Sequence, residues 1–435
     1  MAYVSSADTN RTMIYFLTYT VWTDSKKWNA VRLTLVVFFS GIVAACSDPV
    51  LEPQPPLELI SPAGAGSAQP HLAVSADGAV VFSWLEPNAG DYALRFSALT
   101  ESTWSQTKTL ASGSDWFVNW ADFPSVVPIR GDLWSAHWLV TQEDGFGYDV
   151  VLSTSDDAGA SWSEPIPLHL DGTPTEHGFV TLFPWQDGIG TVWLDGRNFI
   201  QDGEFVFETA SGEPLGMSLR YALFDSDGGR ILAEELDALV CDCCQTDVAF
   251  SGRDALLVYR DRTTEEVRDI VLQRVSSDGW EVPSVLHADN WAIGGCPING
   301  PAIDAQGDHV AVAWFSAVND DPVVHLIQSE DGGRTFLDSI EIDTVGSFGH
   351  VDVAALGSGD TVVSWLRSEG DDLGLMMRVV RRSGELTEPV TIASIDIARP
   401  LDFPQMVYDG TRLIFAWTDF GDVERVRTAV VELAP

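Results

Sequence analysis

Positively charged residues are scarce in this sequence. Lysine and arginine together number 24, against 64 aspartate and glutamate residues, so the formal net charge is −40 at pH 7. Past residue 45 the only lysine is Lys108. A surface of this charge repels the phosphates of nucleic acids and the headgroups of anionic membranes. We therefore expect no nucleic-acid partner, and we expect a monomer.

The sequence also has no apolar run of comfortable membrane-spanning length. The main one lies within residues 26–46, follows the basic pair Lys26 and Lys27, and ends in small residues. A basic start, a short apolar stretch and a small-residue cleavage site are typical of a secretory signal peptide. We therefore predict a signal peptide over residues 1–45, with an uncleaved membrane helix as the alternative. Residues 1–25 fit no part of such a signal, which leaves a later translation start open, for instance at Met13.

The end of this segment, Val43-Ala44-Ala45-Cys46, resembles the lipobox of bacterial lipoproteins. The resemblance implies cleavage before Cys46, diacylation of its thiol, and attachment to a membrane through the lipid. By the same resemblance, Ser47 favours an outer-membrane lipoprotein that faces the periplasm or the cell surface. We interpret residues 46–56 as the lipidated cysteine and a proline-rich, extended tether. Because residues 1–45 hold four basic and two acidic residues, the mature chain carries 20 basic and 62 acidic residues, a net charge of −42.

Helical periodicity is nearly absent, which argues against a helical fold. Instead, a short apolar strand that ends in an aromatic residue recurs about every 50 to 65 residues, in the range of large propeller blades. Further strand-like stretches and Asp-Gly turns accompany most copies, so each repeat is interpreted as a four-stranded antiparallel unit. The recurring aromatic residues are Trp84, Trp138, Trp193, Tyr259, Trp314, Trp365 and Trp417.

These repeats predict an all-β fold, a β-propeller, in which radial repetition protects the strand edges. We favour seven blades, with six as the alternative, in a single domain over residues 57–435. The last repeat ends one strand short. We expect residues 57–63, LELISPA, to supply the missing strand and close the ring.

Two octapeptides, residues 155–162 (SDDAGASW) and 329–336 (SEDGGRTF), share the pattern SxDxGxxW/F. The pattern resembles the Asp-box of the sialidase-like BNR-repeat propellers, and weaker copies occur at residues 276–280 and 224–230. The resemblance implies a turn between the third and fourth strands of a blade, in which the aspartate binds turn amides and the glycine adopts a conformation closed to other residues. It supports the fold, but the turn occurs in enzymes and in binding propellers alike.

The position of this turn divides the loops between two faces. Turns between the first and second strands lie on the same face as the Asp-box. The opposite face, named here the loop face, carries the loops between the second and third strands and the connections between blades. Unusual polar stretches fall on the loop face, at residues 176–178, 195–198, 240–247, 260–269, 289–301 and 349–350. Converging polar residues predict a functional face; the alternative is that they form only salt-bridged turns and structural staples.

The family resemblance implies how such a face works in sialidases, which hold the carboxylate of sialic acid with three arginines and use a tyrosine–acid pair with an aspartate as acid/base. Guanidinium groups bind planar carboxylates through paired hydrogen bonds. The predicted substrate-binding residues are Arg197, Arg260, Arg262 and Arg268, together with His177, Trp291 and Asn299. The alternative for each arginine is an internal pair with a neighbouring acid.

The chain departs from the sialidase pattern in two places. No Arg-Ile-Pro motif occurs near the first repeat, and Tyr259 takes the place of the recurring tryptophans, so it is expected in the blade core. Cleavage of a glycoside needs two carboxyl groups, one as acid and one as base or nucleophile. The predicted catalytic candidates are Asp195, Asp261, Glu265, Asp269 and Asp289.

Beyond Cys46, the cysteines are Cys241, Cys243, Cys244 and Cys296. An even number in an exported protein favours two disulfides. We expect one of the first three to bond Cys296, which leaves a strained short ring, either Cys241–Cys243 or Cys243–Cys244. One alternative is a single disulfide with two functional thiols. The other is a Cu(I) or Zn²⁺ site with His177 or His350 nearby; apart from it, we predict no cofactor.

These expectations combine into a sialidase-like propeller lipoprotein that binds or hydrolyses an anionic glycan or glycoside on its loop face. The alternatives are a non-catalytic ligand-binding or scaffold propeller, and a metal or redox site centred on the cysteines.

Overall fold

The structure is a computed structural model, which describes residues 52–142, 147–276, 279–370, 372–396 and 403–434. The predicted signal peptide and the lipid site at Cys46 lie outside the described residues. Among the described residues, no helix has the length and apolar character that a membrane span requires.

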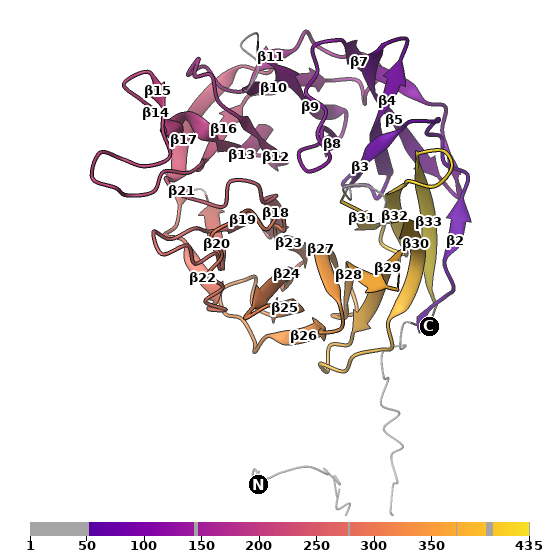
Figure 1. The fold of residues 1–435 in the computed structure, drawn as a ribbon. Coiled ribbons are helices and arrows are strands. Elements are labelled where there is room, and N and C mark those ends of the chain that lie inside the picture. The colour runs from indigo at the N-terminus through magenta and orange to yellow at the C-terminus, as the bar shows by residue number, and fades with distance from the viewer. Residues whose placement is uncertain (1–51, 143–146, 277–278, 371, 397–402, 435) are drawn as a thin grey trace, which may run out of the picture. The chain divides into compact units, whose positions relative to one another are not determined.

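Seven antiparallel sheets follow one another around a ring, which confirms the all-β propeller with seven blades rather than six (Figure 1). Blade 1 contains β3 (Ala68–Val74), β4 (Val80–Asn88), β5 (Asp91–Thr100) and β7 (Lys108–Gly113), with the short β6 (Thr103–Trp104) beside β5. Blade 2 contains β8 (Ser125–Arg130), β9 (Leu133–Thr141), β10 (Tyr148–Ser155) and β11 (Ile166–Pro167). Blade 3 contains β12 (His177–Trp185), β13 (Gly188–Asp195), β16 (Ser218–Phe224) and β17 (Arg230–Asp237).

The remaining blades follow the same order from the inner to the outer strand. Blade 4 contains β18 (Asp247–Ser251), β19 (Asp254–Arg260) and β20 (Ile270–Ser276), with β21 (Gly279–Trp280) and β22 (Ser284–His287) both pairing with β20. Blade 5 contains β23 (Ala302–Gln306), β24 (His309–Val318), β25 (Asp321–Ser329) and β26 (Ile340–Asp343). Blade 6 contains β27 (Ser347–Ala355), β28 (Thr361–Glu369), β29 (Asp372–Val380) and β30 (Val390–Asp396).

Blade 7 is closed by the N-terminal end of the described chain. Its strands β31 (Gln405–Tyr408), β32 (Arg412–Asp419) and β33 (Arg425–Ala434) come from the C-terminus. The outer position is filled by β2 (Leu57–Leu59), which pairs with β33 in the register Leu57↔Val430, and by β1 (Glu52–Pro53). The prediction that residues 57–63 supply the missing strand is confirmed over Leu57–Leu59. Residues 52–53, interpreted from the sequence as tether, also belong to this sheet.

The recurring aromatic residues hold the blades together. All seven lie on the second strand of a blade and are buried. Seven separate hydrophobic clusters occur, and each combines side chains from two adjacent blades. The core is therefore a ring of seven interfaces between sheets, formed because each strand alternates apolar side chains toward its two neighbours.

The two octapeptides fold into the same turn between the third and fourth strands of blades 2 and 5. Asp157 accepts hydrogen bonds from the amides of Ala160 and Ser161, at 3.0 and 2.8 Å, and from the Ser161 hydroxyl at 2.6 Å. Asp331 makes the matching three bonds in blade 5, three blades later. Gly159 has φ +72°, in the left-handed region that other residues avoid. The hydrogen bonds from Ser161 lower the pKa of Asp157 to about 2.

A second recurring device ties the inner strands around a central channel of about 540 Å³. Asp247 accepts the amide of Ile303 in the next blade at 2.8 Å. The corresponding carboxylates of Asp304 and Asp352 accept amides of blades 6 and 7. Each carboxylate also binds the amide that follows it in its own strand. Hydrogen bonds to three successive aspartates thus connect the inner strands of blades 4 to 7.

These aspartates should make the propeller more stable at mildly acidic than at alkaline pH. Burial raises the pKa of Asp247 to about 6 and that of Asp352 to about 8, and it also raises the pKa of Asp304. The folded chain therefore binds these protons more tightly than the unfolded chain does. The stability that they contribute is fully present below the ordinary pKa of about 4 and is lost as the pH rises toward 8. We expect calorimetry to give a higher melting temperature at about pH 5.5 than at about pH 8.5.

The matched variant is Asp352→Asn, which removes the carboxyl group whose pKa is raised to about 8. It should flatten the dependence of melting temperature between about pH 6 and pH 8.5. A wild-type melting temperature that rises over this interval would contradict the assignment.

Candidate functional site

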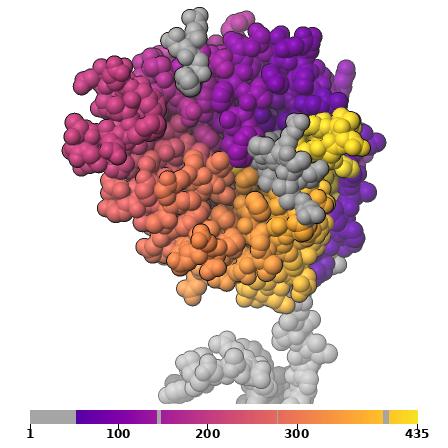
Figure 2. All heavy atoms as spheres, viewed as in Figure 1, coloured from indigo at the N-terminus to yellow at the C-terminus, as the bar shows by residue number. Residues whose placement is uncertain are grey.

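Blade 3 carries the most prominent insertion on the loop face. Between β13 and β16 the chain forms a short 3₁₀ helix, η1 (Gly196–Phe199), and a hairpin of β14 (Ile200–Gln201) and β15 (Glu204–Phe205). Its aromatic side chains Phe205 and Phe207 are 52% and 69% exposed. Figure 2 shows this part of the chain, in magenta, standing out from the ring.

Arg260, predicted to clamp a substrate, is buried and binds the protein's own backbone. Its guanidinium donates to the carbonyls of Asn299, Arg268 and Phe315 at 2.8, 2.7 and 2.6 Å, and it lies over the ring of Trp291 at 5.0 Å. Burial lowers the pKa of Arg260 to about 9. Arg260 therefore holds the connection between blades 4 and 5, and the structure gives it no open position for a ligand.

The predicted ligand residues Trp291 and Asn299 belong to the same connection. Trp291 is buried against Phe315, with ring centroids 5.8 Å apart. The amide oxygen of Asn299 accepts the backbone N–H of His350 at 2.7 Å, and its amide nitrogen donates to the Phe348 carbonyl at 3.3 Å. Both side chains pack blades 4 to 6 together, and we leave them out of the candidate site.

Arg262 and Arg268 pair with acids, as the alternative interpretation of the sequence foresaw. Arg262 donates to Glu266 at 2.7 and 3.0 Å and to Asp242 at 3.0 Å. Arg268 donates to Glu266 at 2.9 Å and to the sulfur of Cys241 at 3.5 Å. A ligand carboxylate would have to displace one of these acids.

Arg197 forms the tightest pair on the face. Its guanidinium meets both oxygens of Asp195 at 2.7 and 2.6 Å and reaches Asp171 at 3.1 Å. Asp195 also accepts the indole N–H of Trp193 at 2.8 Å. Burial opposes ionisation of Asp195, but the hydrogen bonds of Arg197 and the charge of His177 outweigh it and lower the pKa of this carboxyl. Asp195 is thus an ionised, enclosed partner of Arg197.

His177 begins β12 and is fully buried beside Asp195 and Asp171. Its ring stacks on that of His169 with centroids 3.6 Å apart. Sequence reasoning missed His169, Asp171 and Asp149 because they lie in ordinary-looking segments of blade 2. Only the return of the chain from β11 to β12 brings them to His177.

A carboxylate that binds the recurring aromatic residue is found in several blades. In five blades the aromatic residue of the second strand donates its polar hydrogen to a carboxylate near the loop face. The pairs are Trp84–Glu86 at 3.0 Å, Trp193–Asp195 at 2.8 Å, Tyr259–Asp237 at 2.9 Å, Trp314–Asp289 at 2.6 Å and Trp365–Asp343 at 2.7 Å. In four of the five, a basic side chain lies beside the carboxylate: an arginine in three blades, Arg95, Arg197 or Arg367, and His287 in the fourth.

Blade 4 breaks this pattern. Asp237 accepts from the Tyr259 hydroxyl and from the amide of Leu239 at 3.2 Å, and no described residue forms an ion pair with it. Instead it lies beside a second acid, Asp261. Burial and then the charge of Asp237 raise the pKa of Asp261 to about 6. Two half-buried carboxyl groups without an ion-pair partner among the described residues therefore lie where blades 3 and 4 adjoin, close enough for the charge of Asp237 to raise the pKa of Asp261.

The other predicted catalytic acids have different surroundings. Asp269 is buried and accepts the amides of Asn290 and Trp291, each at 3.2 Å. Asp289 is held by Trp314 and by His287 at 2.8 Å. Glu265 is exposed on the hairpin that carries Arg262. Of the five candidates, Asp261 is the one that combines partial exposure with a pKa raised toward neutrality, and its neighbour Asp237 was not among them.

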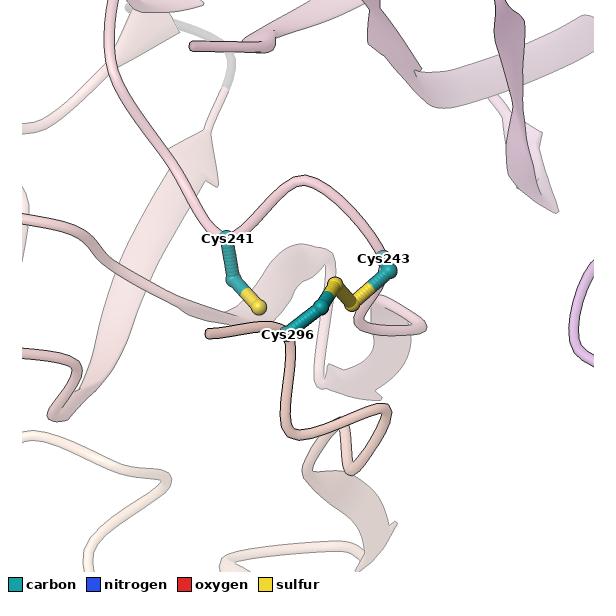
Figure 3. A group of neighbouring side chains, drawn as sticks. All are labelled: Cys241, Cys243 and Cys296. Carbon is teal, nitrogen blue, oxygen red and sulfur yellow. A yellow bond between two sulfur atoms is a disulfide. The ribbon is translucent and has the colours of Figure 1, made fainter. Parts of the chain in front are cut away.

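All four cysteines of the propeller are in disulfides, with the pairs Cys241–Cys244 and Cys243–Cys296. Figure 3 shows Cys243 bonded to Cys296 while Cys241 points beside them. The expected bridge to Cys296 is present, but both predicted short rings, Cys241–Cys243 and Cys243–Cys244, were wrong. Bonding Cys296 to the middle cysteine leaves the outer two, whose Cα atoms lie 5.7 Å apart, within the ordinary disulfide range.

No family model matches this chain, and no curated protein matches it significantly. Its fold is similar to that of solved propellers. Polysaccharide lyase Uly1 aligns with a TM-score of 0.51 over 85% of this chain and 91% of its own, at 8% identity. A protein of unknown function from Dyadobacter fermentans DSM 18053 aligns with a TM-score of 0.48 over 89% of this chain and 100% of its own, at 13% identity.

The NanB sialidase of Streptococcus pneumoniae aligns with a TM-score of 0.44 over 81% of this chain and 83% of its own, at 9% identity. At such identities a structural likeness shows the fold alone, since one fold hosts many activities.

Proposed function

We propose that this protein binds a glycan on its loop face and cleaves it by acid–base chemistry at Asp261 and Asp237. The observation that carries the proposal is the exception in blade 4. Where three of the other four blades with this carboxylate place an arginine beside it and the fourth places His287, blade 4 places a second carboxyl group. Local departures from an internal rule are expected at functional sites.

The environments of the two acids divide the roles between them. Asp261, with a pKa raised to about 6, retains a proton that it can donate to the oxygen of the leaving sugar. Asp237 accepts hydrogen bonds from the Tyr259 hydroxyl and the Leu239 amide, which hold its carboxyl group in place. It would take a proton from the attacking water or attack the sugar carbon itself, the two options open to the second carboxylate of a glycosidase.

The ligand class follows from the charges around this pair. Arg197, Arg260, Arg262 and Arg268 are each engaged by the protein's own carboxylates or carbonyls. They offer no ready clamp for sialic acid, and the surface carries a strong negative charge. We therefore propose a glycan of low charge rather than the anionic glycan expected from the sequence. Exposed Phe205 and Phe207 of the blade 3 insertion suit stacking against sugar rings.

The test uses protein without residues 1–46 on a panel of neutral and anionic fluorogenic glycosides and polysaccharides. Asp261→Asn should lower kcat by about 10²- to 10⁴-fold, the usual contribution of a general acid. The control is Glu281→Gln, an exposed acid of blade 4, which should leave kcat unchanged. Wild-type activity should fall as the pH rises past about 6, because Asp261 then loses its proton. Turnover that survives Asp261→Asn would remove the catalytic assignment, and binding without turnover would leave a lectin-like propeller.

We also propose that the protein is an outer-membrane lipoprotein anchored through Cys46. The lipobox-like sequence supports this, and so do the disulfides, which persist in oxidising compartments outside the cytosol. The mass of the wild-type protein should show a lipid on its N-terminal cysteine, and the variant Cys46→Ser should carry none; a wild-type protein without lipid would argue against lipid anchoring.

A further inference from the structure

A cluster of two histidines and two aspartates lies where blade 2 passes into blade 3, apart from the Asp237–Asp261 pair. His169 and His177 are both buried, and their rings stack nearly parallel, 3.6 Å apart and 11° from coplanar. Asp171 lies along one edge of the stack, and Asp149, at the start of β10, lies along the other.

Asp171 accepts hydrogen bonds from both rings. His169 Nδ1 lies 2.8 Å from one of its oxygens, and His177 Nε2 lies 3.2 Å from the other. Arg197 also donates to this carboxylate, at 3.1 Å, so it is held as an anion. When each ring carries one proton on its Asp171 side, its second nitrogen offers a lone pair. Burial opposes a second proton on His177, but the hydrogen bond to Asp171 and the charges of Asp195, Asp171 and Asp149 outweigh it and raise the pKa of this ring, so a metal ion would compete with that proton.

Those lone pairs face other acceptors. His169 Nε2 and His177 Nδ1 lie 3.4 and 3.6 Å from the same oxygen of Asp149. His169 Nε2 is buried and has no hydrogen-bond partner among the described residues. His177 Nδ1 also faces the carbonyls of Thr175 and Tyr148 at 3.1 and 3.3 Å. Gln142 donates to the same oxygen of Asp149 at 2.6 Å, but His169 Nε2 has no such partner, and a cation among these atoms would satisfy it.

We propose that this cluster binds one divalent ion of the Zn²⁺ class through His169, His177 and Asp149. Bonds of about 2.1 Å to a tetrahedral ion place its ligand atoms about 3.4 Å apart, and the observed separations from Asp149 are 3.4 and 3.6 Å. Imidazole nitrogens select this class over Ca²⁺ or Mg²⁺. The Asp149 side chain is 40% exposed, which provides a path for the ion and room for a water ligand.

Asp171 supplies the outer part of such a site. A carboxylate that holds the far nitrogen of a metal-binding histidine orients the ring and raises its basicity. Here one carboxylate does so for both rings. Because the rings are nearly parallel, binding turns at least one of them toward the other, and the Asp171 hydrogen bonds act as the pivots.

The test is a titration of chelator-treated protein with Zn²⁺ against a chromophoric competitor. We expect one equivalent to bind. His169→Gln should weaken binding by more than about 100-fold, and Asp171→Asn by about 10- to 100-fold. The matched control is His309→Gln, which changes a half-buried histidine of blade 5 bonded to Thr361 and should bind as the wild type does.

Two further measurements keep the result decisive. Asp149→Asn changes a partly exposed side chain, so it separates loss of a ligand from loss of the fold, and the melting temperature of each variant in chelator checks the latter. Substitution by Co²⁺ should give visible bands without sulfur-to-metal charge transfer, which excludes the cysteines as ligands. The proposal is overturned if the wild type binds no ion, if His169→Gln and Asp149→Asn bind as tightly as the wild type, or if the charge-transfer band appears.

Discussion

Replacing Arg260 by alanine should destabilise the propeller by about 3–5 kcal/mol, the range found when one partner of a buried charged network is removed. The change leaves the carbonyls of Asn299, Arg268 and Phe315 without their donor. Each unsatisfied buried acceptor costs about 1–3 kcal/mol, and the stacking on Trp291 is lost as well. Urea unfolding monitored by tryptophan fluorescence would measure the effect.

Arg262→Ala is the matched comparison, because it removes an arginine two residues away on the same face. Its partners Asp242 and Glu266 are 30% and 29% exposed, so water replaces much of what they lose. We expect a destabilisation of about 1 kcal/mol. If the two variants lose the same free energy of unfolding, Arg260 contributes no more to the stability of the propeller than Arg262 does.

Deleting residues 52–59 should lower the melting temperature by on the order of 10 °C. We expect the free energy of unfolding to fall by several kcal/mol, and in a large domain each kcal/mol shifts the melting temperature by a few degrees. The deletion removes β1 and β2, the outer strands of blade 7, and exposes the edge of β33. It takes the buried side chain of Leu59 out of its cluster with Trp104 and Val430. An exposed edge strand also invites aggregation.

The control begins at Glu52, so that it lacks the preceding residues but keeps both closing strands. It should melt as the full mature protein does. Light scattering during the melt would report the aggregation expected of the shorter chain. If the two chains melt at the same temperature, the ring does not depend on closure at the N-terminus.

The blades could be predicted from the sequence because their determinants are local. A strand alternates its side chains with a period of two, and each second strand ends in a large aromatic residue that must be buried between neighbouring sheets. The turn at Asp157 is equally local, since every group it binds lies within four residues. The closing strand could be anticipated because one repeat was a strand short and one apolar segment had no other partner.

From the sequence, the candidate site could be assigned to the loop face but not to particular residues. The same sequence pattern placed Arg260 and Arg262 side by side, yet one guanidinium is enclosed by three backbone carbonyls and the other lies among acids near the surface. Asp237 gave no signal, because it is one acid among many in this chain. What distinguishes it is the arginine or histidine that lies beside its equivalents in four other blades, whereas no described residue forms an ion pair with Asp237. This difference can be recognised only in the folded structure, where the residues around each carboxylate are known.

The cysteines show the same limit. Their number and compartment predicted disulfides, but the pairing follows from side-chain direction: Cys241 and Cys244 point into the core, whereas Cys243 reaches Cys296 in the next blade connection. The sequence by itself determined the repeat and the all-β propeller, because strand periodicity and turn chemistry act over a few residues; it favoured seven blades, and the structure decided between seven and six. Only the tertiary structure decided which charged and polar side chains lie together, since the His169–His177 stack and the Asp237–Asp261 pair form where one blade passes into the next.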